Sequence, residues 1–137
     1  MAELLIEART ENLERVLNFV NEQIERAGCS PKIVAQVDIA VEEIFVNIAC
    51  YAYRPEVGPA TIRCETGGDP FQIIIGFADH GKPYNPLARQ DPDTTLKAEE
   101  REIGGLGILL VKKLMDEVKY EFRDGQNILT IKKDLPA

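Results

Sequence analysis

The chain has 137 residues, of which 45% are hydrophobic and 28% are charged, as expected for one globular domain with a single core. Its net charge of -7, with scattered basic residues, argues against direct nucleic-acid binding, because phosphate contacts need clustered Lys and Arg. No run reaches the ~18 apolar residues of a membrane helix, so we expect no membrane span. Three cysteines without the spacing of a zinc site, and no apolar leader segment, predict reduced thiols in a cytoplasmic protein.

The first part of the sequence predicts a strand and two helices. The apolar run at residues 4–8 is typical of an edge strand, and Thr10 is then the expected N-cap of an amphipathic helix. Ser30 followed by Pro31 is typical of a helix start, because Ser can accept from the free amides and Pro fits the first turn. This second helix is predicted to run to about residue 51.

A predicted hairpin and a long polar segment follow. Residues 61–65 and 71–78 have the composition of strands and flank a turn signal at residues 67–70. Residues 79–103 are polar, contain three prolines and show no sustained period. A connection of that length in a compact domain is usually functional or disordered.

The last part of the sequence predicts a third helix and a closing hairpin. The helix follows the glycines at residues 104–107 and reaches about residue 117, and the hairpin joins residues 118–122 to 127–132. This order of elements predicts an α/β fold, a two-layer α/β sandwich whose mixed, mostly antiparallel sheet carries its helices on one face. With no repeat and no linker, residues 1–137 are expected to form a single domain.

A carboxylate and an amide lie one turn apart on the second predicted helix. At helical spacing, Glu43 and Asn47 point the same way. Asn47 interrupts an apolar stretch, and a buried amide without a partner costs about 1 to 3 kcal/mol. Either Asn47 bonds a neighbouring backbone group and Glu43 is solvated, or Asn47 offers its oxygen to a hard cation. In the second case, Glu43 orders the cation's water or acts as a general base.

Asp79 lies at the end of a predicted buried strand. It follows the apolar run at residues 73–78 and needs a hydrogen-bond donor. A turn would supply one, since Asp and the nearby Gly81 are common turn residues. A ligand with an exocyclic amine, such as adenine, would also supply one, whereas guanine has an acceptor at that position and would be rejected.

The segment Gly104-Gly105-Leu106-Gly107 precedes the third predicted helix. Glycines let backbone amides and a helix N-terminus approach a phosphate closely. A flexible hinge is the other interpretation, and these residues alone leave both open.

The three patterns occur in order and together resemble a known family. Over about residues 5–133, they resemble the N, G1 and G2 boxes of the GHKL ATPases: Glu43-x-x-x-Asn47, Asp79-x-Gly81-x-Pro83 and Gly105-x-Gly107. Within that superfamily, the similarity is to the anti-sigma-factor serine kinase branch, and it is carried by residues 41–47, Tyr53, residues 105–111, Met115 and Asp116.

The resemblance implies a Bergerat-type ATP-binding fold that uses ATP and Mg²⁺. Asn47 would hold Mg²⁺, and Glu43 would be the catalytic base for the Ser or Thr hydroxyl of a partner. Asp79 would bind the adenine amine, and residues 84–103 would form the ATP lid. The remaining nucleotide contacts would come from the glycine boxes: Gly81, Gly104, Gly105, Leu106 and Gly107.

The implied function is that of an ATP-dependent serine/threonine protein kinase that acts as an anti-sigma factor in a partner switch and phosphorylates an antagonist protein. Its partners would be a sigma factor and this anti-anti-sigma antagonist, and a homodimer is a further expectation. The alternatives are an ATP-binding regulatory module without kinase activity and a detached histidine-kinase-type catalytic domain.

Two positions depart from the pattern of the branch. Tyr51 stands where many members have His, and Ile103 stands where some have Arg. Phosphoryl transfer needs a cation near the phosphates, and Arg101 or Lys97 is the candidate to supply it.

Overall fold

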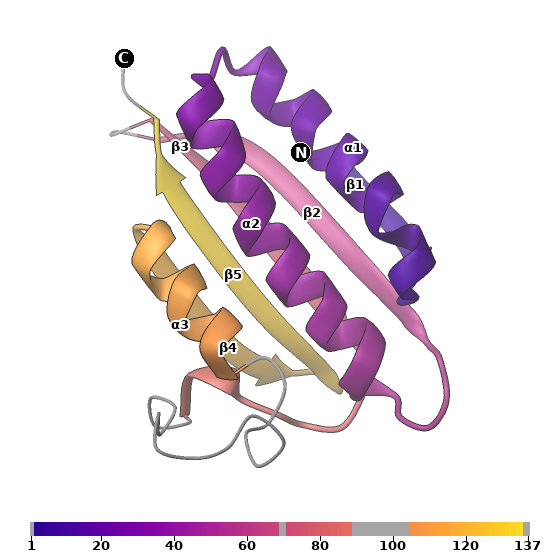
Figure 1. Ribbon diagram of the computed structural model, residues 1–137. Coiled ribbons are helices and arrows are strands. Elements are labelled where there is room, and N and C mark those ends of the chain that lie inside the picture. The colour runs from indigo at the N-terminus through magenta and orange to yellow at the C-terminus, as the bar shows by residue number, and fades with distance from the viewer. Residues whose placement is uncertain (1, 69–70, 89–104, 136–137) are drawn as a thin grey trace.

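The structure is a computed structural model that describes residues 2–68, 71–88 and 105–135. Its elements follow the predicted order (Figure 1). The strands are β1 (Ala2–Glu7), β2 (Pro59–Gly67), β3 (Gln72–Asp79), β4 (Glu117–Arg123) and β5 (Gln126–Asp134). The helices are α1 (Leu13–Arg26), α2 (Pro31–Asn47) and α3 (Gly105–Leu114), with shorter turns at Thr10–Asn12, Ile48–Ala52 and Pro86–Ala88.

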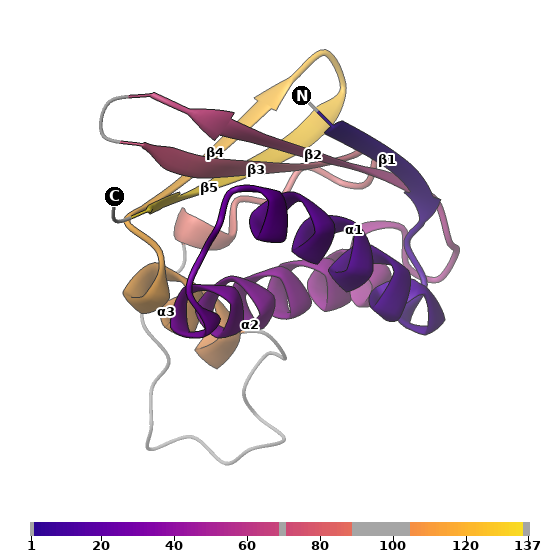
Figure 2. The ribbon, with the colours of Figure 1, turned by 90° about the horizontal axis from the view of Figure 1, so that it is seen from above.

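The strands form one sheet in the order β1-β2-β3-β5-β4, and all four strand pairs are antiparallel. The three helices cover one face of this sheet, which gives the two layers seen from above in Figure 2. The predicted two-layer α/β sandwich is therefore confirmed. β4 runs parallel to β3, but β5 lies between them, so the described residues contain no adjacent parallel pair and the expectation of a mixed sheet reduces to an antiparallel one.

The core lies between the two layers. Ile73, Ile75 and Phe77 alternate along β3 toward the helices, and each is 1% exposed. The buried face of α2 packs against them: Ile33, Val37, Ala40, Val41, Ile44 and Phe45. Burying a side chain of this size stabilises a fold by roughly 1.5 to 3 kcal/mol. This packing fixes α2 across the sheet, so the C-terminal end of α2 is held firmly.

The predicted N-cap residue is confirmed for α2 but not for α1. Ser30 caps α2 as predicted, since its Oγ accepts from the backbone N–H of Ile33 at 3.3 Å. The expectation that Thr10 caps the first helix is wrong, because Thr10 lies inside a short 3-10 turn and α1 begins at Leu13. The side chain of Asn12 holds this turn, donating to the Glu7 carbonyl at 2.9 Å.

The second helix does not continue to residue 51 as a regular α-helix. It ends at Asn47 and widens into a π-helical turn over Ile48–Ala52. Single π turns inside helices are rare and are found frequently at functional sites. The turn changes the direction in which the residues after Asn47 point.

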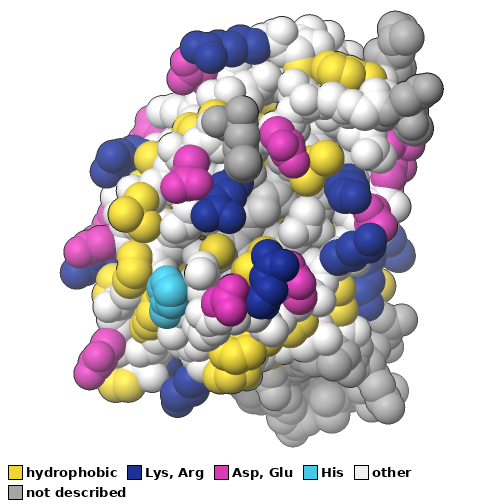
Figure 3. Space-filling view, turned by 180° about the vertical axis from the view of Figure 1, so that it is seen from behind, with side chains coloured by type: hydrophobic (Ala, Val, Ile, Leu, Met, Phe, Trp, Pro, Cys, Tyr) yellow, Lys and Arg dark blue, Asp and Glu magenta, His cyan; other side chains and the backbone are white. Residues whose placement is uncertain are grey.

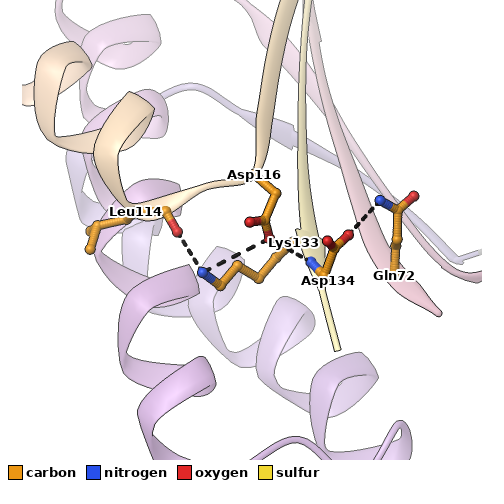
Figure 4. Close-up of polar contacts among 5 residues, drawn as sticks. All are labelled: Gln72, Leu114, Asp116, Lys133 and Asp134. Atoms are coloured by element: carbon orange, nitrogen blue, oxygen red, sulfur yellow. Dashed lines mark hydrogen bonds and ion pairs between the residues drawn. The ribbon is translucent and has the colours of Figure 1, made fainter. Parts of the chain in front are cut away.

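Side chains from β5 and the preceding loop hold the C-terminal end of α3 (Figure 4). Lys133 Nζ donates to the Leu114 carbonyl at 2.8 Å, and its side chain is 15% exposed. Asp116 Oδ2 accepts from the backbone N–H of Asp134 at 2.7 Å, and Gln72 donates to the Asp134 carboxylate at 2.6 Å. The helix ends at Leu114, three residues before the predicted end, and Lys133 satisfies its last carbonyl.

The other face of the sheet carries acidic and basic side chains side by side (Figure 3). Ion pairs such as Arg63–Glu3 at 2.8 Å and Lys132–Glu117 at 3.0 Å bridge neighbouring strands. The three cysteines are free, and burial raises the pKa of the Cys64 thiol to about 11. Of the helices that the structure describes, none has the length and apolar character needed to cross a membrane.

Candidate functional site

A cavity of about 630 Å³ opens between the helix layer and one end of the sheet. The C-terminal end of α2, the segment after β3 and the start of β5 meet here, at the lower edge of Figure 1. Its volume is within the usual range of small-ligand sites. Apolar side chains form most of its wall: Ile44, Ile48, Phe77, Ile108 and Leu129. Asn47 and Asp79 are among the polar residues that line it.

Asp79 is the last residue of β3 and is only 5% exposed. Its Oδ1 accepts two hydrogen bonds, from the Gly81 backbone N–H at 2.9 Å and from Asn127 Nδ2 at 3.0 Å. The turn that was one of the two interpretations of Asp79 is thus present. Its Oδ2 receives no hydrogen bond from the described residues, although a buried carboxylate oxygen without a donor is costly. A ligand that donates a hydrogen bond would offset that cost.

The segment after Asp79 is pressed against the π turn. The Lys82 N–H donates to the Ala52 carbonyl at 3.1 Å, and a Cβ on Gly81 would lie 2.2 Å from that oxygen. Tyr53 holds the same segment, because its hydroxyl accepts from the His80 N–H at 2.7 Å. Glycine at position 81 is therefore required by space.

Replacing Gly81 with Ala should lower the free energy of unfolding by about 1 to 3 kcal/mol, the usual cost of overpacking. The reason is that the added Cβ meets the backbone oxygen of Ala52 rather than a flexible side chain. Urea unfolding followed by circular dichroism measures it. Gly76→Ala is the matched control, since its Cβ would have nothing within 4 Å; equal losses in the two variants would contradict the steric argument.

Asn47 lines the cavity, and its side chain makes no hydrogen bond with the described part of the chain. The interpretation that Asn47 bonds a neighbouring backbone group is therefore not supported. One turn earlier on α2, Glu43 reaches α3, where its Oε2 would lie 2.1 Å from a Cβ built on Gly107. The predicted base and one of the predicted phosphate-binding glycines are thus in contact, which the sequence alone could not show.

The glycine segment is described only in part. Gly105, Leu106 and Gly107 form the first turn of α3, as predicted. Gly104 lies outside the described residues. Within this turn, Gly107 lies beside Glu43, on the side of α2 that faces α3. Such groups have no partner inside a helix and are available to an anion.

A family model described as "Histidine kinase-like ATPase domain" matches residues 6–133. The chain belongs to the histidine kinase-like ATPase domain family. The resemblance predicted from the three boxes is confirmed at this level.

Curated relatives of the same family are named as protein kinases. Serine-protein kinase RsbW of Listeria monocytogenes is 30% identical over 112 residues, which cover 78% of this chain and 70% of the relative. Serine-protein kinase RsbW of Bacillus cereus is 28% identical over 134 residues, which cover 95% of this chain and 82% of the relative. Serine/threonine-protein kinase BtrW of Bordetella bronchiseptica is 26% identical, with 74% and 71% covered. The chain is thus a protein-kinase member of the histidine kinase-like ATPase domain family.

Solved structures share the fold. The RsbU and RsbW domains of a Mycobacterium tuberculosis protein match with a TM-score of 0.67 at 17% identity, covering 100% of this chain and 34% of that one. The histidine kinase AdeS of Acinetobacter baumannii matches with a TM-score of 0.53 at 12% identity, covering 100% of this chain and 69% of that one. The chain spans about a third of the first structure, so this likeness concerns the ATPase-type fold alone.

Two basic side chains that the sequence analysis did not single out line the cavity of this family member. Arg54 and Lys82 both line it, and the Arg54 guanidinium lies 5.9 Å from the centre of the Tyr51 ring. A cation over an aromatic face is attracted by the ring. Tyr51, one of the two departures from the resemblance, therefore supports a basic residue that lines the cavity. An Arg after a helix end gives no sequence signal of such a role.

Several predicted residues cannot be placed. Lys97, Arg101, Ile103 and most of the predicted lid lie outside the described residues. The described part of the lid begins at Tyr84, which lines the cavity. The described residues contain no group of three His, Cys, Asp or Glu side chains that could hold a metal ion. A single amide ligand such as Asn47 is nonetheless consistent with Mg²⁺, which keeps several waters and shares its coordination with substrate phosphates.

Proposed function

We propose that the chain is a Mg-ATP-dependent serine/threonine protein kinase. The observation that carries this proposal is Asp79: a carboxylate that is 5% exposed lines a cavity of about 630 Å³, and one of its oxygens receives no hydrogen bond from the described residues. The exocyclic amine of adenine supplies the missing donor. The kinase names of the relatives support the same conclusion.

Most of the residues around the cavity would bind the nucleotide and its Mg²⁺. Asp79 accepts from the adenine amine, and the apolar wall around Ile48 and Leu129 contacts the base. Asn47 offers its amide oxygen to Mg²⁺, which supplies charge neutralisation at the phosphates when bound. The remaining phosphate contacts would come from Gly81 and from the backbone of the glycine segment: Gly104, Gly105, Leu106 and Gly107.

Glu43 is proposed as the general base that takes the proton from a Ser or Thr hydroxyl. Its carboxylate contacts Gly107, so the base lies next to the helix end that would hold the phosphates. It is partly exposed, which leaves it accessible to a hydroxyl group of another protein. A base in this place can serve phosphate transfer only if the nucleotide and the hydroxyl meet at the same helix end.

The proposed partners are a sigma factor and an antagonist protein whose Ser or Thr accepts the phosphate, and the proposed compartment is the cytoplasm, where such partners act. The motifs at residues 41–47 and 105–111 support this anti-sigma assignment.

An ATP-dependent clamp that holds a partner without phosphorylating it is the second candidate, since all the nucleotide contacts would serve it equally. Phosphate on a partner's Ser or Thr is the readout that separates the two. A histidine-kinase-type role rests on fold likeness at 12% identity.

Replacing Asp79 with Asn should weaken ATP binding by about 10- to 100-fold, as expected for the loss of a hydrogen bond to a buried charge. Discrimination against GTP should fall at the same time, because an amide can also donate to the guanine oxygen. Calorimetric titration with both nucleotides measures this.

Asp38→Asn is the matched control for that measurement. Asp38 also accepts a hydrogen bond from an Asn side chain, Asn21 Nδ2, at 2.9 Å, and burial is the chief cause that raises its pKa. It lies at the contact between α1 and α2, away from the cavity. This variant should keep the wild-type preference for ATP. A wild type that binds GTP as tightly as ATP would refute the adenine contact.

A further inference from the structure

Asn127 is a buried amide at the rim of the cavity that sequence analysis did not predict. Asn127 and Asp79 are the buried polar or charged side chains among the described residues, at 8% and 5% exposed. They face each other in the register of β5 and β3, and both line the cavity. A buried pair of this kind needs well-defined hydrogen bonds to be tolerated.

The amide of Asn127 uses its whole hydrogen-bonding capacity within the protein. Its Nδ2 donates to Asp79 Oδ1 at 3.0 Å and to the Lys82 carbonyl at 2.9 Å. Its Oδ1 accepts from the Tyr84 N–H at 3.0 Å and from the Tyr120 hydroxyl at 2.5 Å. These partners fix which end is oxygen, since a backbone N–H only donates and a carbonyl only accepts. Two donors and two acceptor sites are thus satisfied, and none remains for a ligand.

The hydrogen bond from Asn127 helps to fix the orientation of the Asp79 carboxylate. Asn127 and the Gly81 N–H together occupy Oδ1, so the carboxylate presents one oxygen to the cavity. The same amide also holds Lys82 and Tyr84, which form part of the cavity wall. Asn127 therefore sets both the orientation of the carboxylate and the shape of the wall beside it.

We propose that Asn127 is a positioning residue that sets the nucleobase selectivity of the site by holding Asp79 in one orientation toward the exocyclic amine of the base. This inference rests on the proposed function and adds the residue that makes its adenine contact selective. A hydrogen bond to an acceptor that is already held in place contributes more to the binding free energy, because the acceptor need not be ordered when the ligand binds. Removal of Asn127 should thus reduce selectivity and not only stability.

The test compares ATP with purine riboside triphosphate, which has the same sugar and phosphates but lacks the 6-amino group. Wild type should bind ATP more tightly by about 10-fold or more, as expected for a hydrogen bond to a charged group. Asn127→Leu, which keeps the branching of the side chain and removes its polar atoms, should bring the two affinities to near equality. Calorimetry on the full chain with Mg²⁺ gives both constants.

Two further variants control for folding. Asn21→Leu removes the other Asn–Asp pair, in which Asn21 Nδ2 donates to Asp38 at 2.9 Å, and it should keep the wild-type ratio. Tyr120→Phe removes one bond to the Asn127 oxygen and keeps the ring, so it should lower the ratio part of the way. This last variant decides the question if Asn127→Leu does not fold.

A folded Asn127→Leu, or Tyr120→Phe in its place, with the wild-type ratio would overturn the positioning role while leaving the adenine contact intact. A wild type that binds the two triphosphates equally would overturn the adenine contact of the proposed function, and with it this inference. The two failures are therefore distinguishable by the wild-type ratio alone.

Discussion

Glu43→Gln should slow phosphate transfer to a captured partner protein by about 10²- to 10⁴-fold, the usual contribution of a general base. Its affinity for Mg-ATP should change little, because a base acts in the transition state and not in nucleotide binding. The amide keeps the size of the side chain and its contact with Gly107, but it cannot readily take a proton from a Ser hydroxyl. Single-turnover transfer from labelled ATP measures the rate.

The neighbouring residue provides the control for this experiment. Glu42 lies on the exposed side of α2, whereas Glu43 is partly buried against α3. Glu42→Gln removes the same charge and should transfer phosphate at the wild-type rate. Equal rates in wild type and Glu43→Gln would exclude Glu43 as the base. If wild type itself transfers no phosphate to a captured antagonist, the kinase assignment fails and the ATP-dependent clamp replaces it.

Asn47→Ala should abolish the dependence of ATP binding on Mg²⁺. The affinity for Mg-ATP should drop by at least about 10- to 100-fold, the range found when even the outer partners of metal ligands are removed. Stability should hardly change, because the Asn47 amide makes no hydrogen bond with the described residues. Calorimetric titrations with Mg²⁺ and with a chelator separate the metal-dependent part of the affinity from the rest.

Gln36→Ala removes another amide from α2, at a position in the middle of the helix, and should leave both titrations unchanged. Should Asn47→Ala retain the wild-type affinity for Mg-ATP, Asn47 is not a metal ligand. A loss of affinity that is equal with and without Mg²⁺ would instead assign Asn47 to the nucleotide alone.

The elements and much of the cavity could be predicted because they depend on local signals. Helical spacing places Glu43 and Asn47 on adjacent turns, and the apolar run before Asp79 predicts a strand that ends at a buried carboxylate. Ser30 and Pro31 mark the start of α2 for the same local reason. The contact between Glu43 and Gly107 could not be predicted, because it depends on how α3 packs against α2.

Asn127 escaped prediction because its role depends on strand register. In the sequence it follows Asp124 and Gly125, and an Asn in that position is typical of the end of a turn. Only the pairing of β3 with β5 brings it opposite Asp79. The sequence spacing between these two residues holds no information on that pairing.

The π turn at Ile48–Ala52 is a second feature without a sequence signal. Its residues are compatible with an ordinary continuation of α2, and apolar spacing does not distinguish the two forms over five residues. The 3-10 turn at Thr10–Asn12 was missed for a related reason, since Thr is a good cap wherever a helix could begin.

Each end of α3 lies beside an opposite charge, the Lys133 ammonium at Leu114 and the Glu43 carboxylate at the first turn. At ten residues, α3 is shorter than the roughly 12 to 15 that a helix needs to be even marginally stable alone. Lys133 supplies a positive charge to the negative end of the helix dipole at Leu114. At the positive end, a phosphate of the proposed nucleotide would add a second negative charge beside Glu43, worth about 0.3 to 2 kcal/mol. We therefore expect the C-terminal end of α3 to stay in place when the proposed nucleotide binds, and any change in the helix to occur in its first turn.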